Sequence, residues 1–328
     1  MPNDVVDIRQ FDSSALGHLL DAEVQAWNLG LHWDYTASRR LISNCLDEKR
    51  LAGYALRLAG ELAGYSFFFY EGAKGLIGNL YVDAERARLE CAAVLLKHVI
   101  ETLLATPALD RVETQLPHFT MEELEPVFRP RRFESYLRRF MILSLAQRRR
   151  SLYGSGMSEA GGPGPQDSAL KHFRIVPWER KHDRAVAELI AGAYRHHVDA
   201  HINDQYNSLA GTTHLVESIV QQRGCGETIP AASLVAIHQP TGKFAAALAV
   251  TSVRNRTAHI PQVAVTQEFQ NHGLGTALMS VAFQELSRQG YEEVSLTVTD
   301  LNAGAVRLYE RLDFETYRTF GAFVWERQ

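Results

Sequence analysis

The chain has 328 residues, 46% of them hydrophobic, and this composition excludes wholesale disorder. Its 34 Lys and Arg against 38 Asp and Glu give a formal net charge of −4, which argues against a general nucleic-acid binder and against docking on an anionic membrane. No apolar run approaches the roughly 20 residues that a membrane-spanning helix needs, and the acidic N-terminus lacks the pattern of a signal peptide. We therefore expect a cytoplasmic protein with no membrane or nucleic-acid partner. Three widely spaced cysteines predict neither a disulfide framework nor a zinc site.

The length predicts two domains, at roughly 100–200 residues for each. Residues 147–170 are rich in Gly, Ser and Pro and show no apolar periodicity, so they are predicted to form a flexible linker. This division gives a first domain over 1–146 and a second over 171–328.

The two predicted domains share a plan. Each opens with a short strand-like run, at 5–8 and at 173–176. Near the end of each lies a similar four-residue sequence, Phe133-Glu-Ser-Tyr136 and Phe314-Glu-Thr-Tyr317. Such parallels suggest an internal duplication.

In the second half the predicted elements alternate between strands and helices. In chain order they are strands at 233–238 and 244–253, a turn at 240–243, a strand at 259–266, a helix at 273–288, a strand at 293–299, a helix at 303–312 and a strand at 317–325. The fold class is therefore α+β, with a mixed, mostly antiparallel sheet flanked by helices.

The informative motif is Gln270-x-x-Gly273-x-Gly275, which lies between a predicted strand and a predicted helix. Glycines at a helix start let backbone N–H groups approach an anion, and the helix N-terminus carries unpaired N–H groups and a positive dipole end. This arrangement predicts a pyrophosphate cradle. Taken alone, the two glycines fit an ordinary helix-start turn better than they fit a pyrophosphate cradle.

A second motif follows about thirty residues later, Asn302-Ala-Gly-Ala-Val-Arg-Leu-Tyr309 with Asp313-Phe314 at its end. The two motifs together resemble the acyl-CoA-binding signature and the second signature of the GNAT superfamily of N-acyltransferases, with Asp313 at the usual glycine. The resemblance covers roughly 173–327. With the repeated plan, it implies two tandem GNAT-like domains.

The resemblance implies acetyl-CoA as co-substrate and no metal. The residues it implies for acetyl-CoA binding lie on the strand end, the loop, the helix start and the second motif: Val263, Ala264, Val265, Gln270, Asn271, His272, Gly273, Leu274, Gly275, Thr276 and Asn302. Tyr309 matches the family's general acid, since a phenol is neutral at pH 7 and can protonate a departing thiolate. The alternative for Tyr309 is a core aromatic side chain.

The general base is less well defined. The family often uses a Glu on the strand before the loop, and here the two usual positions hold His259 and Pro261. His259 is the candidate catalytic base, because an imidazole titrates near neutrality. It could equally be an ordinary strand histidine. Gln262 could position a water.

The segment 194–206 is rich in titratable side chains and matches the region that usually overhangs the acceptor site in this family. The predicted substrate-binding residues are His197, Asp199, His201, Asn203 and Tyr206. His197, His201 and Asp204 have the spacing of one helix face, which could hold a metal, and solvated or capping roles are the other alternative.

The first domain is predicted to be a degenerate GNAT domain. If Val82 matches Val265, Glu90 replaces Gly273 and Ala92 replaces Gly275, and a carboxylate in the cradle would repel a pyrophosphate. An aromatic cluster around Trp27 and Tyr35 occupies the region that matches 194–206.

We expect an acetyl-CoA-dependent N-acetyltransferase that transfers an acyl group by direct attack of the amine of a small molecule. The alternatives are a non-catalytic acyl-CoA-binding or regulatory protein and an O-acyltransferase.

Overall fold

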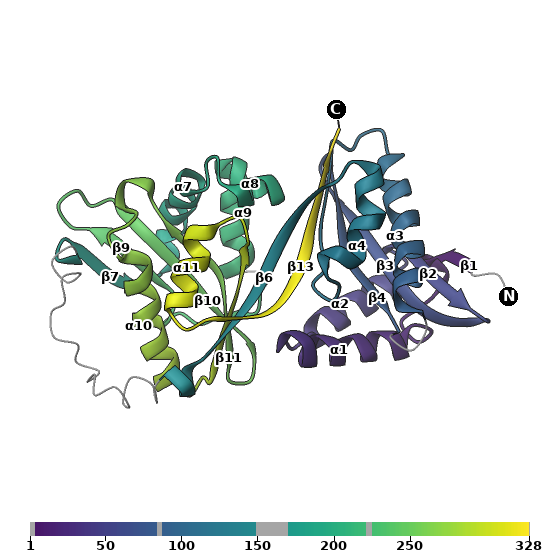
Figure 1. Cartoon of the computed structure of the whole chain (residues 1–328), viewed down its shortest axis with the longest axis horizontal. Coiled ribbons are helices and arrows are strands. Elements are labelled where there is room, and N and C mark those ends of the chain that lie inside the picture. The colour runs from purple at the N-terminus through teal and green to yellow at the C-terminus, as the bar shows by residue number, and fades with distance from the viewer. Residues whose placement is uncertain (1–3, 84–86, 149–169, 221–224, 328) are drawn as a thin grey trace. The chain divides into compact units, whose positions relative to one another are not determined.

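The computed structural model describes residues 4–83, 87–148, 170–220 and 225–327. The chain forms two compact units, unit 1 with residues 1–138 and 319–328, and unit 2 with residues 139–318. It passes from unit 1 to unit 2 within strand β6 (Glu134–Ser144) and returns within β13 (Glu315–Glu326) (Figure 1).

This grouping differs from the predicted division, because the last ten residues belong to unit 1 and residues 139–146 to unit 2. Residues 149–169, most of the predicted linker, lie outside the described part of the chain. Within the described residues, no helix is both long enough and apolar enough to cross a bilayer.

Unit 1 is a sheet between two helical layers (Figure 1). Its elements are β1 (Asp4–Asp7), α1 (Gly17–Leu31), α2 (Thr36–Asp47), β2 (Ala52–Leu58), β3 (Glu61–Glu71), β4 (Lys74–Val82), α3 (Arg88–Leu104), β5 (Arg111–Gln115), α4 (Met121–Phe128) and the end of β13. The strand order is β1-β2-β3-β4-β5-β13, with β4 and β5 parallel. One face packs on α3 and α4 and the other on α1 and α2.

Unit 2 repeats these layers. Its elements are β7 (Phe173–Pro177), α7 (Asp183–Ala193), α8 (Val198–Ile202), α9 (Leu209–Val220), β8 (Glu227–Thr228), β9 (Leu234–His238), β10 (Phe244–Arg254), β11 (Thr257–Val265), α10 (Leu274–Arg288), β12 (Glu293–Thr299) and α11 (Ala303–Arg311). The order is β6-β12-β11-β10-β9-β7. Apolar residues of α10 and α11 cover one face, and those of α7 and α9 the other.

The strands and helices predicted for the second half are confirmed to within about three residues at each end. The strand predicted at 293–299 has those bounds, and the helix predicted at 273–288 begins at Leu274. These elements were predictable because their apolar residues recur with the period of a strand or of a helix.

The two parallel strands of unit 2 part at Pro261. Pairing of β11 with β12 covers Thr257 to Ile260 only. The register of β11 against β10 shifts at the same point, between the pairs Ala249–Gln262 and Thr251–His259. This β-bulge bends β11, and proline lacks the N–H that further pairing would need. The strand end beyond the bulge therefore leaves β12.

Candidate active site

The end of β11 has one edge open. Thr266 N–H donates to Ala245 O at 2.9 Å, and hydrogen-bonded pairs alternate along an antiparallel ladder. The backbone groups of Val263 and Val265 therefore point away from β10, towards the side that β12 has left. This edge is the strand surface on which the resemblance places the pantetheine arm.

The loop after β11 presents a row of backbone donors. Gly273, with φ of 80°, is the N-cap of α10, and no atom lies within 4 Å of the position that a Cβ would take. Among the described residues, none accepts a hydrogen bond from the N–H groups of residues 271–276, and the first helical bond runs from Ala277 N–H to Gly273 O at 2.9 Å. Unpaired N–H groups at the positive end of a 15-residue helix fit a pyrophosphate.

The second glycine of the motif lies in the first turn of α10. A Cβ at Gly275 would approach the Leu308 side chain to 3.4 Å. Gly275 therefore lets the start of α10 pack closely against α11, and it leaves the N–H side of the turn without a side chain.

Helix α11 ends in a Schellman motif that explains the second signature. Phe314 N–H donates to Tyr309 O at 3.0 Å, Asp313 N–H donates to Glu310 O at 3.1 Å, and Asp313 has φ of 69°. The accompanying apolar contact joins Phe314 to Tyr309, edge to face, with centroids 5.9 Å apart. Tyr309 is 6% exposed, so burial and the helix end fix the position of its ring.

On the opposite face of the sheet, a hydrogen-bonded chain joins β11 to the segment after α7. Tyr206 donates to Gln262 Oε1 at 2.9 Å, Gln262 Nε2 donates to Tyr194 Oη at 2.9 Å, and Tyr194 donates to Val263 O at 3.2 Å. The two phenol rings stack with centroids 4.1 Å apart. Burial raises the pKa of Tyr194 well above its usual value, and interactions with Tyr206, Asp199 and Tyr309 add to the rise.

A second set of contacts joins α8 to β12 and α11. Asp199 accepts a hydrogen bond from Thr299, and its Oδ2 lies 3.5 Å from His197 Nδ1. His197 caps the N-terminus of α8, and its Nε2 lies 3.1 Å from Asn302 Nδ2. Asn302 in turn caps α11 through Ala305 N–H at 3.2 Å. The predicted acceptor residue His197 thus contacts Asn302, a predicted acetyl-CoA residue, and Asp199 contacts His197.

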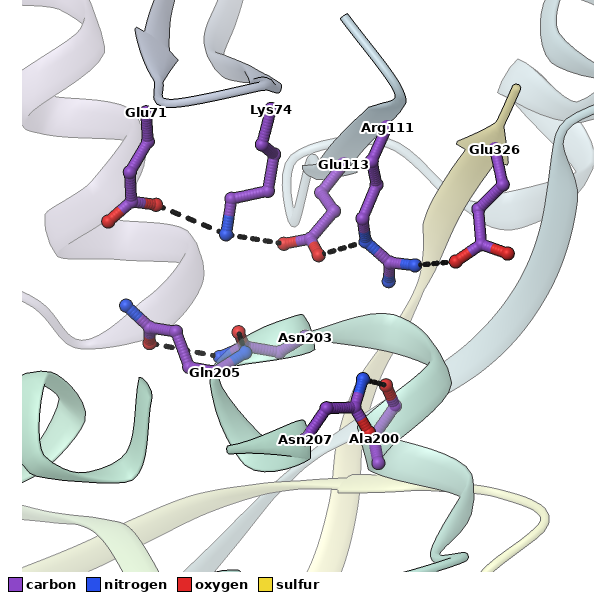
Figure 2. A network of polar contacts seen from close by, with 9 residues as sticks. All are labelled: Glu71, Lys74, Arg111, Glu113, Ala200, Asn203, Gln205, Asn207 and Glu326. Atoms are coloured by element: carbon purple, nitrogen blue, oxygen red, sulfur yellow. Dashed lines mark hydrogen bonds and ion pairs between the residues drawn. The ribbon is translucent and has the colours of Figure 1, made fainter. Parts of the chain in front are cut away.

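Two other predicted substrate residues, His201 and Asn203, lie outside this set of contacts. His201 is exposed on α8, and Asn203 accepts from Gln205 N–H at 3.0 Å as the cap of the short helix Asp204–Asn207. Figure 2 shows Asn203 turned towards Gln205 and Asn207 bonded to Ala200 O. The single helix face expected for His197, His201 and Asp204 is wrong, because α8 ends at Ile202.

Within the described residues, no three His, Cys, Asp or Glu side chains are grouped closely enough to hold a metal ion.

His259 lies on the same sheet face as the tyrosine chain but is 7% exposed. Its Nδ1 lies 2.9 Å from Ser295 Oγ, and its ring is stacked with Phe140 at a centroid distance of 6.4 Å. Burial lowers the pKa of this imidazole to about 4. Such an imidazole holds a proton too weakly to serve well as a base at neutral pH, so the structure counts against His259 in this role.

Known proteins resemble both the sequence and the fold. The profile of the acetyltransferase (GNAT) family matches residues 196–314. The ribosomal protein bS18-alanine N-acetyltransferase of Escherichia coli strain K12 is 40% identical over 73 residues, which are 22% of this chain and 49% of that enzyme. The chain thus spans about half the length of the curated relatives it matches.

Among solved structures, a tandem GNAT protein from the clavulanic acid biosynthesis pathway has a TM-score of 0.60 at 16% identity, over 99% of this chain and 98% of that one. Residues 196–314 thus match the GNAT family, and the chain as a whole has the fold of a tandem GNAT protein. A GCN5-related N-acetyltransferase from Sphaerobacter thermophilus has a TM-score of 0.59 at 16% identity, over 84% of this chain and 80% of that one. These likenesses confirm the predicted fold, two GNAT-like domains in tandem.

The start of α3 in unit 1 differs from the start of α10 in unit 2. Helix α3 begins at Arg88 with Ala87 as its left-handed N-cap, so Ala87 is the counterpart of Gly273. The connection from Val82 is three residues shorter than the one from Val265. The sequence alignment of Glu90 with Gly273 is therefore wrong by three positions. In the corrected alignment Leu89, 46% exposed, matches Gly275, and Glu90 still lies in the first helical turn.

The Schellman motif recurs in unit 1 without the phenol. Phe133 N–H donates to Phe128 O at 3.5 Å, Arg132 has φ of 62°, and the two phenylalanine rings meet at 5.1 Å. Phe128 thus stands where Tyr309 stands in unit 2.

The acceptor-side region of unit 1 is filled by its own side chains. Trp27 stacks on Tyr35 at 4.6 Å, as Tyr194 stacks on Tyr206. Glu23 is fully buried one helical turn before Trp27 and accepts hydrogen bonds from Trp27, Tyr65 and Asn79. Burial raises the pKa of Glu23.

Unit 1 also carries a row of alternating charges across β3, β4, β5 and β13. Glu71 pairs with Lys74 at 3.1 Å, Lys74 with Glu113 at 3.6 Å, and Arg111 bonds both Glu113 and Glu326 (Figure 2). Lys74, Arg111 and Glu113 are each less than 10% exposed. Each buried charge is paired, which makes this row a structural feature of the unit 1 sheet.

Sequence reasoning missed Tyr194 as a site residue and treated Gln262 only as a possible water ligand. A signal for Tyr194 was present in the duplication. Trp27 and Tyr194 are separated by 167 positions, and so are Ile8 and Ile175, which lie in the first strand-like runs of the two halves.

Proposed function

We propose that the protein is an acetyl-CoA-dependent N-acetyltransferase that acts through unit 2 on the amine of a small molecule. The observation that carries the proposal is the junction of an open strand edge at Val263 and Val265 with the row of N–H donors at residues 271–276. Together they match the two chemically distinct parts of an acyl-CoA, an extended amide chain and a pyrophosphate.

Each part of the donor has fitting protein groups. The N–H groups of the loop and the positive end of α10 would hold the pyrophosphate, and the open space at Gly273 admits it. The edge of β11 would pair with the pantetheine arm as an added strand, and an N–H on that edge would stabilise negative charge on the thioester oxygen. Asn302, the N-cap of α11, would lie beside this arm.

The acyl transfer needs one base and one acid. The amine nitrogen attacks the thioester carbon, a new C–N bond forms, the C–S bond breaks, and Tyr309 gives its proton to the leaving thiolate. The proton lost by the amine goes to a base. We propose His197 for this role over His259, because His197 is 28% exposed and lies beside the Asp199 carboxylate.

The acceptor is proposed to lie against the 194–206 segment. Asp199 supplies a carboxylate for a cationic amine. Tyr206 is held against the β11 face of the sheet by its hydrogen bond to Gln262. The curated relative from Escherichia coli acts, by its name, on an alanine of a ribosomal protein. A polypeptide N-terminus is therefore the second candidate acceptor.

Unit 1 is proposed to bind no acyl-CoA. Leu89 in place of Gly275, Glu90 in the first turn and Phe128 in place of Tyr309 all count against donor binding or catalysis there. Unit 1 then serves as a supporting domain.

The deciding experiment is a panel of small amines and N-terminal peptides with acetyl-CoA, read by release of free thiol. Amine-dependent release that is lost in Tyr309→Phe supports the proposal. Acetyl-CoA binding without release for any amine or peptide would favour the non-catalytic alternative, and release with alcohols only would favour O-acyl transfer.

A further inference from the structure

Both carbonyl groups on the open edge of β11 are covered by side chains. Val263 O accepts from the Tyr194 hydroxyl at 3.2 Å, and Val265 O accepts from Gln270 Nε2 at 3.3 Å. An uncovered strand edge is prone to pair with another chain, so these two contacts protect it. They also occupy the atoms that an added strand would use.

Tyr194 connects this edge to the acceptor side. It is the C-cap residue of α7, it stacks on Tyr206 at 4.1 Å, and its ring meets the His197 ring edge to face at 4.9 Å. Its oxygen also accepts from Gln262 Nε2 at 2.9 Å. A shift of the Tyr194 hydroxyl away from Val263 would therefore change the contacts that Tyr194 makes with Tyr206, His197 and Gln262.

We infer that Tyr194 is a positioning residue that closes the β11 edge until the pantetheine arm of the acyl donor takes over Val263 O, and that its release adjusts the acceptor segment. The inference rests on the proposed function. Secondary amides of the arm carry N–H donors that can replace the phenol at this carbonyl. The donor then binds before the acceptor, because the side chains of the 194–206 segment take up the positions that bind the acceptor only after Tyr194 has moved.

A single substitution is not a clean test. Gln262 Nε2 lies 3.4 Å from Val263 O and would take the place of the missing hydroxyl in Tyr194→Phe. The double variant Tyr194→Phe/Gln262→Met removes both donors and keeps the aromatic stack on Tyr206. Tyr317→Phe is the control, since it removes one exposed phenol of unit 2 and leaves the hydrogen bonds of Tyr194 and Gln262 intact.

The experiment is calorimetric titration of the full chain with two probes, coenzyme A and 3′-phospho-ADP. The second probe has the pyrophosphate and lacks the pantetheine arm. We expect the double variant to bind coenzyme A about 5- to 10-fold more tightly, which corresponds to one internal hydrogen bond no longer displaced. The Kd of 3′-phospho-ADP stays unchanged, and Tyr317→Phe behaves as the unmodified chain with both probes.

Equal or weaker binding of coenzyme A by the double variant would overturn the inference, as would an equal gain for 3′-phospho-ADP. The unmodified chain separates this failure from failure of the proposed function. If it binds neither probe, both the function and the inference fail. If it binds both and the double variant changes nothing, only the role of Tyr194 fails.

Discussion

Phe128 in unit 1 and Tyr309 in unit 2 occupy the same position of the same helix-ending motif. Each lies at the start of a Schellman turn, each meets a following phenylalanine edge to face, and each is buried. The duplicated fold therefore keeps the packing of this position in both units, while only unit 2 keeps a hydroxyl. This difference supports the proposal that the chemistry takes place in unit 2.

Tyr309→Phe should lower the turnover number by about 10²–10⁴-fold and leave the Kd of acetyl-CoA nearly unchanged, because general acid catalysis contributes that much and the ring packing is preserved. Steady-state kinetics with calorimetric binding would measure both. Tyr317→Phe, at a tyrosine 49% exposed, is the control and should keep full turnover. Unchanged turnover in Tyr309→Phe, with chemistry shown to be rate-limiting, would remove Tyr309 from the acid role.

Gly275→Glu should abolish acetyl-CoA binding, since the side chain adds bulk beside Leu308 and negative charge at the start of α10. The duplication offers a matched control in Leu89→Glu, the same change at the counterpart in unit 1. That variant should bind one acetyl-CoA per chain as before. Two equivalent sites in the unmodified chain, or loss of binding in Leu89→Glu, would contradict the assignment of the donor site to unit 2.

Much of the fold was predictable because local signals decide it. Alternating apolar residues predicted β12 at its observed bounds, and the glycine motif predicted the start of α10 within one residue. The loop length in unit 1 was not predictable in the same way. The counterpart of Gly273 is an alanine, Ala87, so no glycine marked this position in the sequence. The sequence alignment therefore placed Glu90, three positions later, opposite Gly273.

The candidate site was predictable only where backbone conformation demands a residue type. Gly273 has a left-handed φ, and that demand is visible in the sequence. The chain from Tyr206 through Gln262 to Tyr194 depends on which side chains two distant segments bring together, and no local pattern encodes this. The burial of His259 depends on Phe140 and Ser295, which lie far away in sequence, so its lowered pKa was equally invisible.

Asp313→Gly should raise the free energy of unfolding by about 0.5–1 kcal/mol, because Asp313 has φ of 69°, where side chains are disfavoured. Its ion pair with Arg148, at 3.7 Å and with the Asp313 side chain 65% exposed, contributes little against this. Chemical denaturation would measure the change. Asp313→Asn, which removes the charge and keeps the backbone cost, should stay close to the unmodified chain. A gain in the Asn variant equal to that in the Gly variant would assign the effect to charge.

His259 should make unit 2 less stable in mild acid. Its pKa is lowered from 6.5 to about 4 in the folded state, so between these values the unfolded chain binds a proton that the folded chain does not. The free energy of unfolding therefore falls as the pH drops from about 6.5 to 4, by at most about 3 kcal/mol from this group. Denaturation at several pH values should show a smaller fall in His259→Gln. The exposed His172→Gln should keep the full fall, and parallel curves for all three proteins would refute this account.

His197→Gln should lower kcat/KM by about 10²–10⁴-fold and remove the rise in rate with pH across the range in which an imidazole titrates. The groups that face His197 are Asp199, Asn302 of α11 and the Tyr194 ring. Asp199→Asn should raise the KM for the amine by about 10- to 100-fold, because a charge-assisted contact is lost, and leave acetyl-CoA binding intact.

The matched control for His197 is His201→Gln, which changes an exposed histidine of the same short helix and should keep both the rate and its pH profile. pH–rate profiles of kcat/KM for the four proteins separate the roles, since a merely structural loss at His197 would lower the rate at every pH without changing the shape of the curve. A profile that still rises with pH in His197→Gln would place the base elsewhere. Because His259 is buried with a pKa of about 4, the candidates left would be a water ordered by Gln262 or the carboxylate of Asp199.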